Sequence, residues 1–240
     1  MMKNIQERIY IALDMDNMDD ALRLVDRLGD TFRSYKVGMQ LYNLVGPELV
    51  SRLHAEGCRI FADLKFHDIP NTVACAADTM TRQGVAMFNV HVAGGVEMMR
   101  RAKQAAEKRA KECGKQIPLV IGVTQLTSTS QQVLNEEIGI TGTVEEAVIR
   151  YAKLAKEAGL DGVVASGHEV TAIREACGDD FVTVIPGIRP IWAEKNDQVR
   201  VMTPRRALEA GAHYLVIGRA ITAASDPKSA ALRILEEIQD

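Results

Sequence analysis

The chain has 240 residues, 47% of them hydrophobic, which is enough to bury a large core. Its net charge is −3, and no basic run is long enough to indicate a nucleic-acid or membrane-surface partner. The 4 cysteines are widely spaced, which favours reduced thiols over a disulfide framework or a zinc site. Residues 1–8 are polar, and no stretch approaches the roughly 18 apolar residues of a membrane helix, so we expect a soluble, cytoplasmic protein.

Short apolar runs alternate with amphipathic segments along the whole chain. The apolar runs predict strands at residues 8–13, 35–39, 59–62, 87–92, 119–123, 162–165, 181–185 and 214–217. Helical spacing and helix-ending glycines predict helices at residues 19–28, 47–55, 71–83, from after Gly95 through 111, and at 144–158, 171–176, 205–210 and 228–238. Two longer connections, at residues 127–142 and 188–203, are predicted to be irregular.

These segments form eight strand–helix units spaced by about 30 residues, as parallel strands with helical crossovers require. The runs at 120–123 and 215–217 are apolar throughout, which is typical of strands covered on both faces. We therefore predict a single (β/α)8 TIM barrel that forms one domain over residues 1–240. A doubly wound open sheet is the alternative, but no glycine-rich fingerprint follows the first strand.

A charged segment follows the third predicted strand. Asp63 and Lys65 are two residues apart, so on a strand their side chains point the same way. A carboxylate and an ammonium at the end of a buried strand cost desolvation free energy unless they satisfy each other or a ligand. Asp68 adds a second carboxylate in the loop, and Pro70 suits the first turn of the next helix. Two acids that bracket a lysine at a strand end indicate a site.

In such a barrel the active site lies at the C-terminal ends of the strands. The polar candidates at those ends are Asp14, Lys36, Asp63, Lys65, Asn89, His91, Thr124, Thr127, Ser166, Pro186, Arg189, Gly218 and Arg219. Any one of them alone is most often a rim ion pair or a packing residue, but their joint appearance at one mouth indicates a functional site. His91 is interpreted as a hydrogen-bonded packing residue, and no role is assigned to His67, Asn89 or Ser166.

The end of the eighth strand has the character of a phosphate clamp. Gly218 lets backbone N–H groups approach an anion, a following helix start adds its dipole, and the guanidinium of Arg219 can fork onto oxygens. The loop after the seventh strand brings Arg189 and Gln198 to the neighbouring sector, where barrels often hold phosphate. The alternative is an arginine that lies at a helix terminus and binds no phosphate.

Charge alternation at the mouth bears on the chemistry. Three acids could hold Mg²⁺, but two interleaved ammonium groups would repel a dication. A Schiff-base lysine must become neutral, whereas flanking carboxylates favour the charged form. The pattern favours electrostatic and proton-donor roles over covalent catalysis, with no metal.

The motif Asp63-x-Lys65-x-x-Asp68-Ile69-Pro70-Asn71-Thr72 resembles the signature of the orotidine 5′-phosphate decarboxylase family. The resemblance covers nearly the whole chain, because matching segments occur at residues 12–14, 36–38, 124–128, 186–189 and 217–219. It implies loss of CO2 from orotidine 5′-monophosphate to give UMP, the last step of de novo UMP synthesis, with no cofactor and no metal.

The resemblance also implies roles for the charged residues. Lys36, Asp63, Lys65 and Asp68 would form an alternating network in which Lys65 donates a proton to C6 of the pyrimidine. Asp63 would lie against the substrate carboxylate, and Asp14 and Lys36 would hold the ribose hydroxyls. The remaining substrate contacts implied by the family are Thr127 for the pyrimidine and Pro186, Arg189, Gln198, Gly218 and Arg219 around the base and phosphate.

In the family, Asp68, Ile69 and Thr72 reach the partner's site across a homodimer, so shared active sites are expected.

Two alternative functions stay open. A Mg²⁺-dependent phosphosugar decarboxylase of the keto-gulonate-phosphate type carries a glutamate metal ligand at the end of strand two, where this chain has Lys36. A non-catalytic phosphoribosyl-binding barrel would tolerate loss of Lys65 or Asp63, and both are present.

Overall fold

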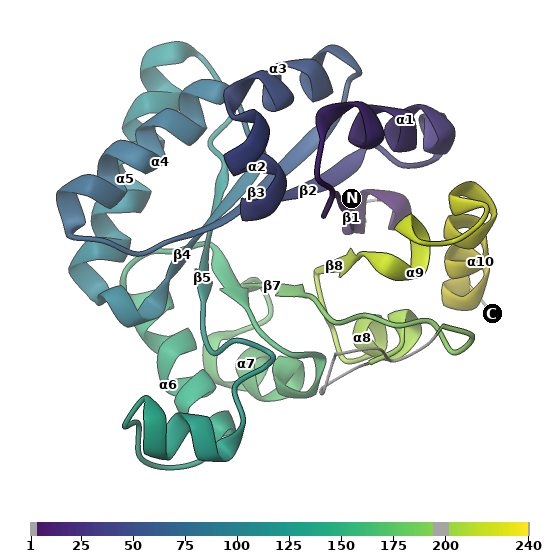
Figure 1. Cartoon of the computed structure of the whole chain (residues 1–240). Helices are drawn as coiled ribbons and strands as arrows, with labels where there is room; N and C mark the ends of the chain where they lie inside the picture. Colours follow the sequence, from purple (N-terminus) through teal and green to yellow (C-terminus); the bar gives the residue numbers. More distant parts are fainter. Residues whose placement is uncertain (1–3, 194–201, 240) are drawn as a thin grey trace.

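The computed structural model describes residues 4–193 and 202–239 and contains a closed barrel of eight parallel strands (Figure 1). The strands follow one another around the barrel in chain order, so the predicted (β/α)8 barrel is confirmed. They are β1 Ile9–Ala12, β2 Ser34–Gly38, β3 Arg59–Phe66, β4 Met87–His91, β5 Leu119–Val123, β6 Gly162–Val164, β7 Val182–Ile185 and β8 Tyr214–Ile217.

Helices form the outer layer of the barrel (Figure 1). They are α1 Met18–Leu28, α2 Met39–Val45, α3 Pro47–Ala55, α4 Pro70–Gln83, α5 Val96–Cys113, α6 Val144–Glu157, α7 Val170–Cys177, α8 Pro204–Glu209, α9 Arg219–Thr222 and α10 Pro227–Gln239. Within the described ranges, no helix is long and apolar enough to cross a membrane.

The structure adds two helices to those predicted, α2 and α9. Gly46, at φ 72°, ends α2, and Pro47 begins α3. The sequence pattern predicted only the helix after this glycine–proline pair, because α2 has just 7 residues before it. α9 has 4 residues, which is too short for a helical period to be recognised. The predicted irregular connection at 127–142 contains a π-helical turn, Val133–Glu137.

Side chains fill the barrel interior beneath the strand ends. Tyr10 stands at the centre of this inner cluster, with ring centroids 5.9 Å from Phe61 and 5.7 Å from Tyr214, both in edge-to-face geometry. A second, larger cluster fills the space between the strands and the helices. The interior is therefore a packed core, and a site can form only above it, at the strand ends.

One irregularity interrupts the barrel, between β3 and β4. Ala62 pairs with Phe88, and the next pair is Phe66 with Val90, so β3 advances four residues while β4 advances two. Such a bulge re-aims the side chains of the inserted residues. The bulge contains Lys65, which at φ 51° is the one non-glycine residue with positive φ in the described part of the chain.

Gly162, at the start of β6, lies against the backbone of β7. A Cβ atom on Gly162 would stand 2.0 Å from the carbonyl oxygen of Val182, far inside van der Waals contact. Backbone of a paired strand cannot move aside as a flexible side chain can, so the position requires glycine.

Gly162→Ala is therefore expected to lower the free energy of unfolding by about 3 kcal/mol, near the upper end for overpacked cores. Urea unfolding measures the change. Gly167→Ala is the matched control, because the added methyl group would meet the flexible side chain of Met202, and it should cost clearly less. Equal losses in the two variants would contradict the steric reason.

Candidate active site

A cavity of about 290 Å³ opens at the C-terminal ends of the barrel strands. This volume is close to the lower bound of roughly 300 Å³ for small-molecule sites. Nine of the predicted site residues line it: Asp14, Lys36, Asp63, Lys65, Thr127, Pro186, Arg189, Gly218 and Arg219. They come from the loop after β1, from β2 and β3, and from the loops after β5, β7 and β8, as expected for a site at the C-terminal strand ends.

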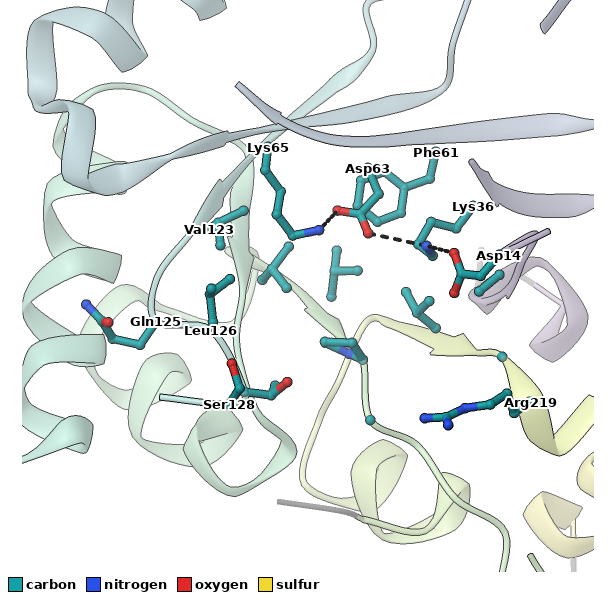
Figure 2. A pocket seen from close by; sticks show the side chains of 18 of the residues that line it. Asp14, Lys36, Phe61, Asp63, Lys65, Val123, Gln125, Leu126, Ser128 and Arg219 are labelled. Carbon is teal, nitrogen blue, oxygen red and sulfur yellow. Dashed lines mark hydrogen bonds and ion pairs between the residues drawn. The ribbon is translucent and has the colours of Figure 1, made fainter. Parts of the chain in front are cut away.

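Four charged side chains form a row along one wall of the cavity (Figure 2). Asp14 Oδ1 accepts a hydrogen bond from Lys36 Nζ at 2.8 Å. Lys36 Nζ also lies 3.4 Å from Asp63 Oδ2. On its other side, Asp63 Oδ1 accepts a hydrogen bond from Lys65 Nζ at 2.7 Å. Acid and base thus alternate along this row, which we call the charge row.

Asp63 is the shared member of the charge row, and its environment keeps it ionised. Its side chain is 15% exposed, and burial alone raises the pKa of the carboxyl group. The charges of Lys36 and Lys65, with hydrogen bonds from Lys65 and Asn89, outweigh burial together, so the pKa of Asp63 is lower than its ordinary value. At neutral pH the carboxylate is therefore charged and held between two ammonium groups.

Asn89 of β4 supports the charge row from behind, a role that the sequence left undecided. Its side-chain amide donates a hydrogen bond to Asp63 Oδ1 at 2.7 Å, and its side-chain oxygen accepts one from the backbone N–H of Lys65 at 2.8 Å. The side chain is completely buried. The available sequence signal was an amide between the apolar residues Phe88 and Val90, since a buried amide needs hydrogen-bond partners.

The backbone of Lys65 is held in a conformation that side-chain-bearing residues rarely adopt. A left-handed φ such as its 51° costs of order 1–3 kcal/mol and persists only where the surroundings over-determine it. Here the hydrogen bond to Asn89 holds the backbone N–H of Lys65, and the ion pair to Asp63 holds its ammonium group. Conformational strain thus coincides with the proposed centre of the site.

Two guanidinium groups line the same cavity on the side of β7 and β8. Arg189 is buried, and its Nη1 donates to the carbonyl oxygen of Ile188 at 3.0 Å. Arg219 opens α9 and extends into the cavity in Figure 2. A helix start follows Gly218 directly, as a phosphate clamp there would need, but α9 has 4 residues and carries few aligned peptide dipoles. Gln198, the other predicted contact here, lies outside the described residues.

A model of the family described as "Orotidine 5′-phosphate decarboxylase / HUMPS family" matches residues 7–234. The chain belongs to this family. It is 51% identical to the orotidine 5′-phosphate decarboxylase of Heliobacterium modesticaldum over 235 residues, which cover 98% of this chain and 97% of that protein. The protein of the same name from Syntrophomonas wolfei is 50% identical over 236 residues, with 98% and 99% covered.

Solved structures agree with this assignment. The crystal structure of orotidine 5′-phosphate decarboxylase from Lactobacillus acidophilus superposes with a TM-score of 0.86 at 38% identity, covering 98% of this chain and 100% of that chain. The corresponding enzyme structure from Pyrococcus horikoshii has a TM-score of 0.75 at 26% identity, covering 97% and 99%. The barrel of this family member is therefore like theirs over nearly its whole length.

Part of the family signature lies outside the cavity of this single chain. Asp68, Ile69 and Thr72 do not line it and are exposed, Ile69 by 67%. Asp68 Oδ1 accepts a hydrogen bond from the backbone N–H of Ile69 at 2.7 Å, which orders the loop before Pro70 and α4. Their predicted contact with a partner subunit is not tested by one chain and stays a prediction.

Two other strand-end hydroxyl groups serve the backbone. Thr124 Oγ1 donates to the carbonyl oxygen of Val164 at 2.9 Å. Ser166 forms a capping box: its Oγ accepts the N–H of His168 at 3.4 Å, and its own N–H donates to Glu169 Oε2 at 2.6 Å. These contacts explain why both residues are polar without giving either a role in catalysis.

His67 and His91 lie together beside the charge row, with ring centroids 5.5 Å apart. Burial lowers the pKa of His91, and the neighbouring His67 and Lys65 lower it further, against the opposing effect of Asp63. A neutral ring is therefore favoured at neutral pH. The interpretation of His91 as a hydrogen-bonded packing residue stays a prediction.

Asp63→Asn removes the carboxylate that Lys36 and Lys65 share. We expect the free energy of unfolding at pH 7 to fall by about 3 kcal/mol, because removing one partner of a buried ion pair leaves uncompensated charge. The folded-state pKa of Asp63 is lowered, so the stability from its ionised form is complete above the unfolded-state value of about 3.9 and is lost as pH falls through the folded-state pKa.

The difference between wild type and Asp63→Asn should therefore shrink on acidification, as urea unfolding over a series of pH values can measure. The control is Glu97→Gln, which breaks a solvent-exposed pair with Arg100 and should cost less than about 1 kcal/mol. An Asp63→Asn difference that does not change between neutral and strongly acidic pH would show that the carboxylate is not held in its charged form.

Proposed function

We propose that this protein decarboxylates orotidine 5′-monophosphate to UMP and CO2, the last step of de novo UMP synthesis. The observation that carries the proposal is the charge row, in which Asp63 Oδ1 lies 2.7 Å from the Nζ atom of Lys65 at the wall of the cavity. Family membership and relatives named for this reaction support the choice of substrate.

In the proposed mechanism, the bond between C6 and the carboxylate carbon breaks and CO2 leaves. The electron pair that remains at C6 lies in the ring plane and cannot delocalise into the π system, so charges fixed beforehand must stabilise it. The ammonium of Lys65 supplies that charge and then transfers a proton from Nζ to C6, which completes UMP. Lys65 regains its proton from solvent. Asp63 orients the ammonium through their hydrogen bond.

The rest of the cavity would bind the nucleotide. Asp14 and Lys36, joined at 2.8 Å, would hold the ribose hydroxyl groups. Binding energy from the remote phosphate can be used to close loops over the reacting carbon. The residues assigned to the base and the phosphate are Thr127, Pro186, Arg189, Gln198, Gly218 and Arg219.

We propose that the reaction needs neither metal nor cofactor. Two ammonium groups lie 2.7 and 3.4 Å from the oxygens of Asp63, where they would repel a divalent cation. This arrangement argues against the Mg²⁺-dependent phosphosugar decarboxylase reading, in which Lys36 would be replaced by a metal ligand. Retention of both Lys65 and Asp63 argues against a non-catalytic phosphoribosyl-binding barrel.

We further propose a cytoplasmic homodimer of single-domain subunits, spanning residues 1–240, with shared active sites. Asp68, Ile69 and Thr72 would complete the site of the partner subunit. Their exposure in one chain, and above all the 67% exposure of the apolar Ile69, fits a surface that a second copy covers.

Purified protein should convert orotidine 5′-monophosphate to UMP, measured as loss of orotate absorbance and release of CO2. The rate should be the same in excess EDTA, because fixed side-chain charges provide the stabilisation. Absence of turnover would refute the proposed activity. A rate that requires Mg²⁺ would support the phosphosugar alternative.

In the same assay, Lys65→Ala should lose roughly 10³-fold or more in kcat, as expected when a proton donor and its charge are both removed, while still binding UMP.

A subunit-mixing experiment tests the shared site. Asp68→Ala and Lys65→Ala should each be nearly inactive alone, because each damages every site of its homodimer. In a mixed dimer, one of the two sites has both residues intact, so mixing should restore up to about half of the wild-type rate per hybrid dimer. Mixing each variant with itself is the control. No recovery, when mass spectrometry shows that subunits have exchanged, would rule out action across the dimer.

A further inference from the structure

Asn89 makes two hydrogen bonds that join the two central members of the charge row. Its side-chain NH2 donates to Asp63 Oδ1 at 2.7 Å, and its side-chain oxygen accepts from the backbone N–H of Lys65 at 2.8 Å. Its exposed fraction is 0%, and the cavity is lined by Asp63 and Lys65 in front of it. Asn89 thus contacts both residues from the side away from the cavity.

The chemistry of the two partners determines which way the Asn89 amide points. An ionised carboxylate can only accept hydrogen bonds, and a backbone N–H can only donate one. A flipped amide would set oxygen against the carboxylate of Asp63 and NH2 against the N–H of Lys65, which would break both contacts. An ionised aspartate, of similar size, can accept from the Lys65 N–H but cannot donate to Asp63, and leucine can satisfy neither partner.

The bulge in β3 explains why a side chain is needed at this point. Residues 63–65 fall between the paired positions Ala62 and Phe66, so the regular ladder with β4 is interrupted beside Lys65. The side chain of Asn89 provides the acceptor for the Lys65 N–H that the ladder does not. It does so at the residue whose φ of 51° needs to be held by its surroundings.

We propose that Asn89 is a positioning residue for the decarboxylation: it holds the backbone of Lys65 and the carboxylate of Asp63 so that the Lys65 ammonium meets the reacting carbon. The inference rests on the proposed function and adds to it a residue that does not touch the substrate. Loss of Asn89 should therefore reduce kcat far more than it changes KM, because misplacement by about 1 Å can cost roughly 10²-fold in rate.

The same contact predicts a change in pH dependence. The groups that face Asp63 are Lys36 from β2, Lys65 from β3 and Asn89 from β4, and Asp14 joins them through Lys36. His91, also on β4, interacts with Asp63 electrostatically. The hydrogen bond from Asn89 is one of the causes that lower the pKa of Asp63. Without it that pKa rises, so the activity that depends on ionised Asp63 should be lost at a higher pH as the solution is acidified.

Asn89→Ala and Asn89→Asp test the proposal. Asn89→Ala should lower kcat about 10²-fold with KM within about threefold of wild type, and should move the acid limb of the kcat profile to higher pH. Asn89→Asp conserves size and the acceptor for Lys65, but it sets a second carboxylate against Asp63. It should shift the acid limb further and keeps the test valid if the alanine variant folds poorly.

The matched control is Thr183→Val, which removes a fully buried side chain's hydrogen bond to His213 elsewhere in the barrel. It should lower thermal stability while leaving kcat and its pH profile unchanged. If the Asn89 variants behave like Thr183→Val, with stability reduced and kcat and pH profile unaltered, the positioning role is refuted.

A measurement without turnover separates this inference from the proposed function. In Asn89→Ala, the backbone amide of Lys65 should exchange with deuterium at least tenfold faster than in wild type, and the Asp63 carboxyl, followed by ¹³C NMR, should titrate at higher pH. Unchanged exchange and titration would refute the positioning role even in an active enzyme. A wild-type protein that lacks activity on orotidine 5′-monophosphate would refute the function and leave these two readouts intact.

Discussion

One buried carboxylate shared by two ammonium groups is the interaction on which the rest of the site depends. Lys36 and Lys65 both converge on Asp63, which balances the charge of Lys65 and shares that of Lys36 with Asp14. The charges come from neighbouring strands. Because the carboxyl ends of adjacent parallel strands meet at one edge, β1, β2, β3 and β4 bring Asp14, Lys36, Asp63 and Asn89 side by side. The charge row is therefore assembled by neighbouring strands of the barrel, and one local motif could not supply all of its members.

The charged site lowers the stability of the fold, and the packed apolar layer beneath it offsets that loss. Buried charge and a left-handed lysine both oppose folding at the barrel mouth. Directly below, the aromatic cluster around Tyr10 fills the barrel interior with apolar side chains. Phe61 belongs to both regions, because it packs against Tyr10 and also lines the cavity. Phe61 lies two residues before Asp63 on β3, so the strand that carries the shared carboxylate is packed into the apolar layer.

The sequence was informative wherever a single period or position rule decides the outcome. Alternating apolar runs and helices predicted the barrel, and the strand-end rule selected the charged residues that line the cavity, including Asp14, Lys36 and Arg219. It failed where geometry arises between strands. The two-residue insertion in β3 has no signal in β3 alone, so neither the φ of Lys65 nor the hydrogen bonds of Asn89 could be derived from spacing. Asp68 is a third kind of case, since its predicted partner is a second chain.

The distribution of charge around the cavity separates binding from chemistry under the proposed reaction. The charge row has two acids and two bases, so it adds no net charge where the reacting carbon would lie. Arg189 and Arg219 add two positive charges in the sector of β7 and β8, which suit the negative charge of a phosphate. Contacts to the phosphate do not reach the reacting carbon, so their binding energy can act on the rate only indirectly, by closing loops over the site. Direct stabilisation of the developing charge must come from the charge row, where the negative charge shifts from the departing carboxylate to C6 beside Lys65. The orientation of one ammonium group, and hence whatever holds it, then governs the rate.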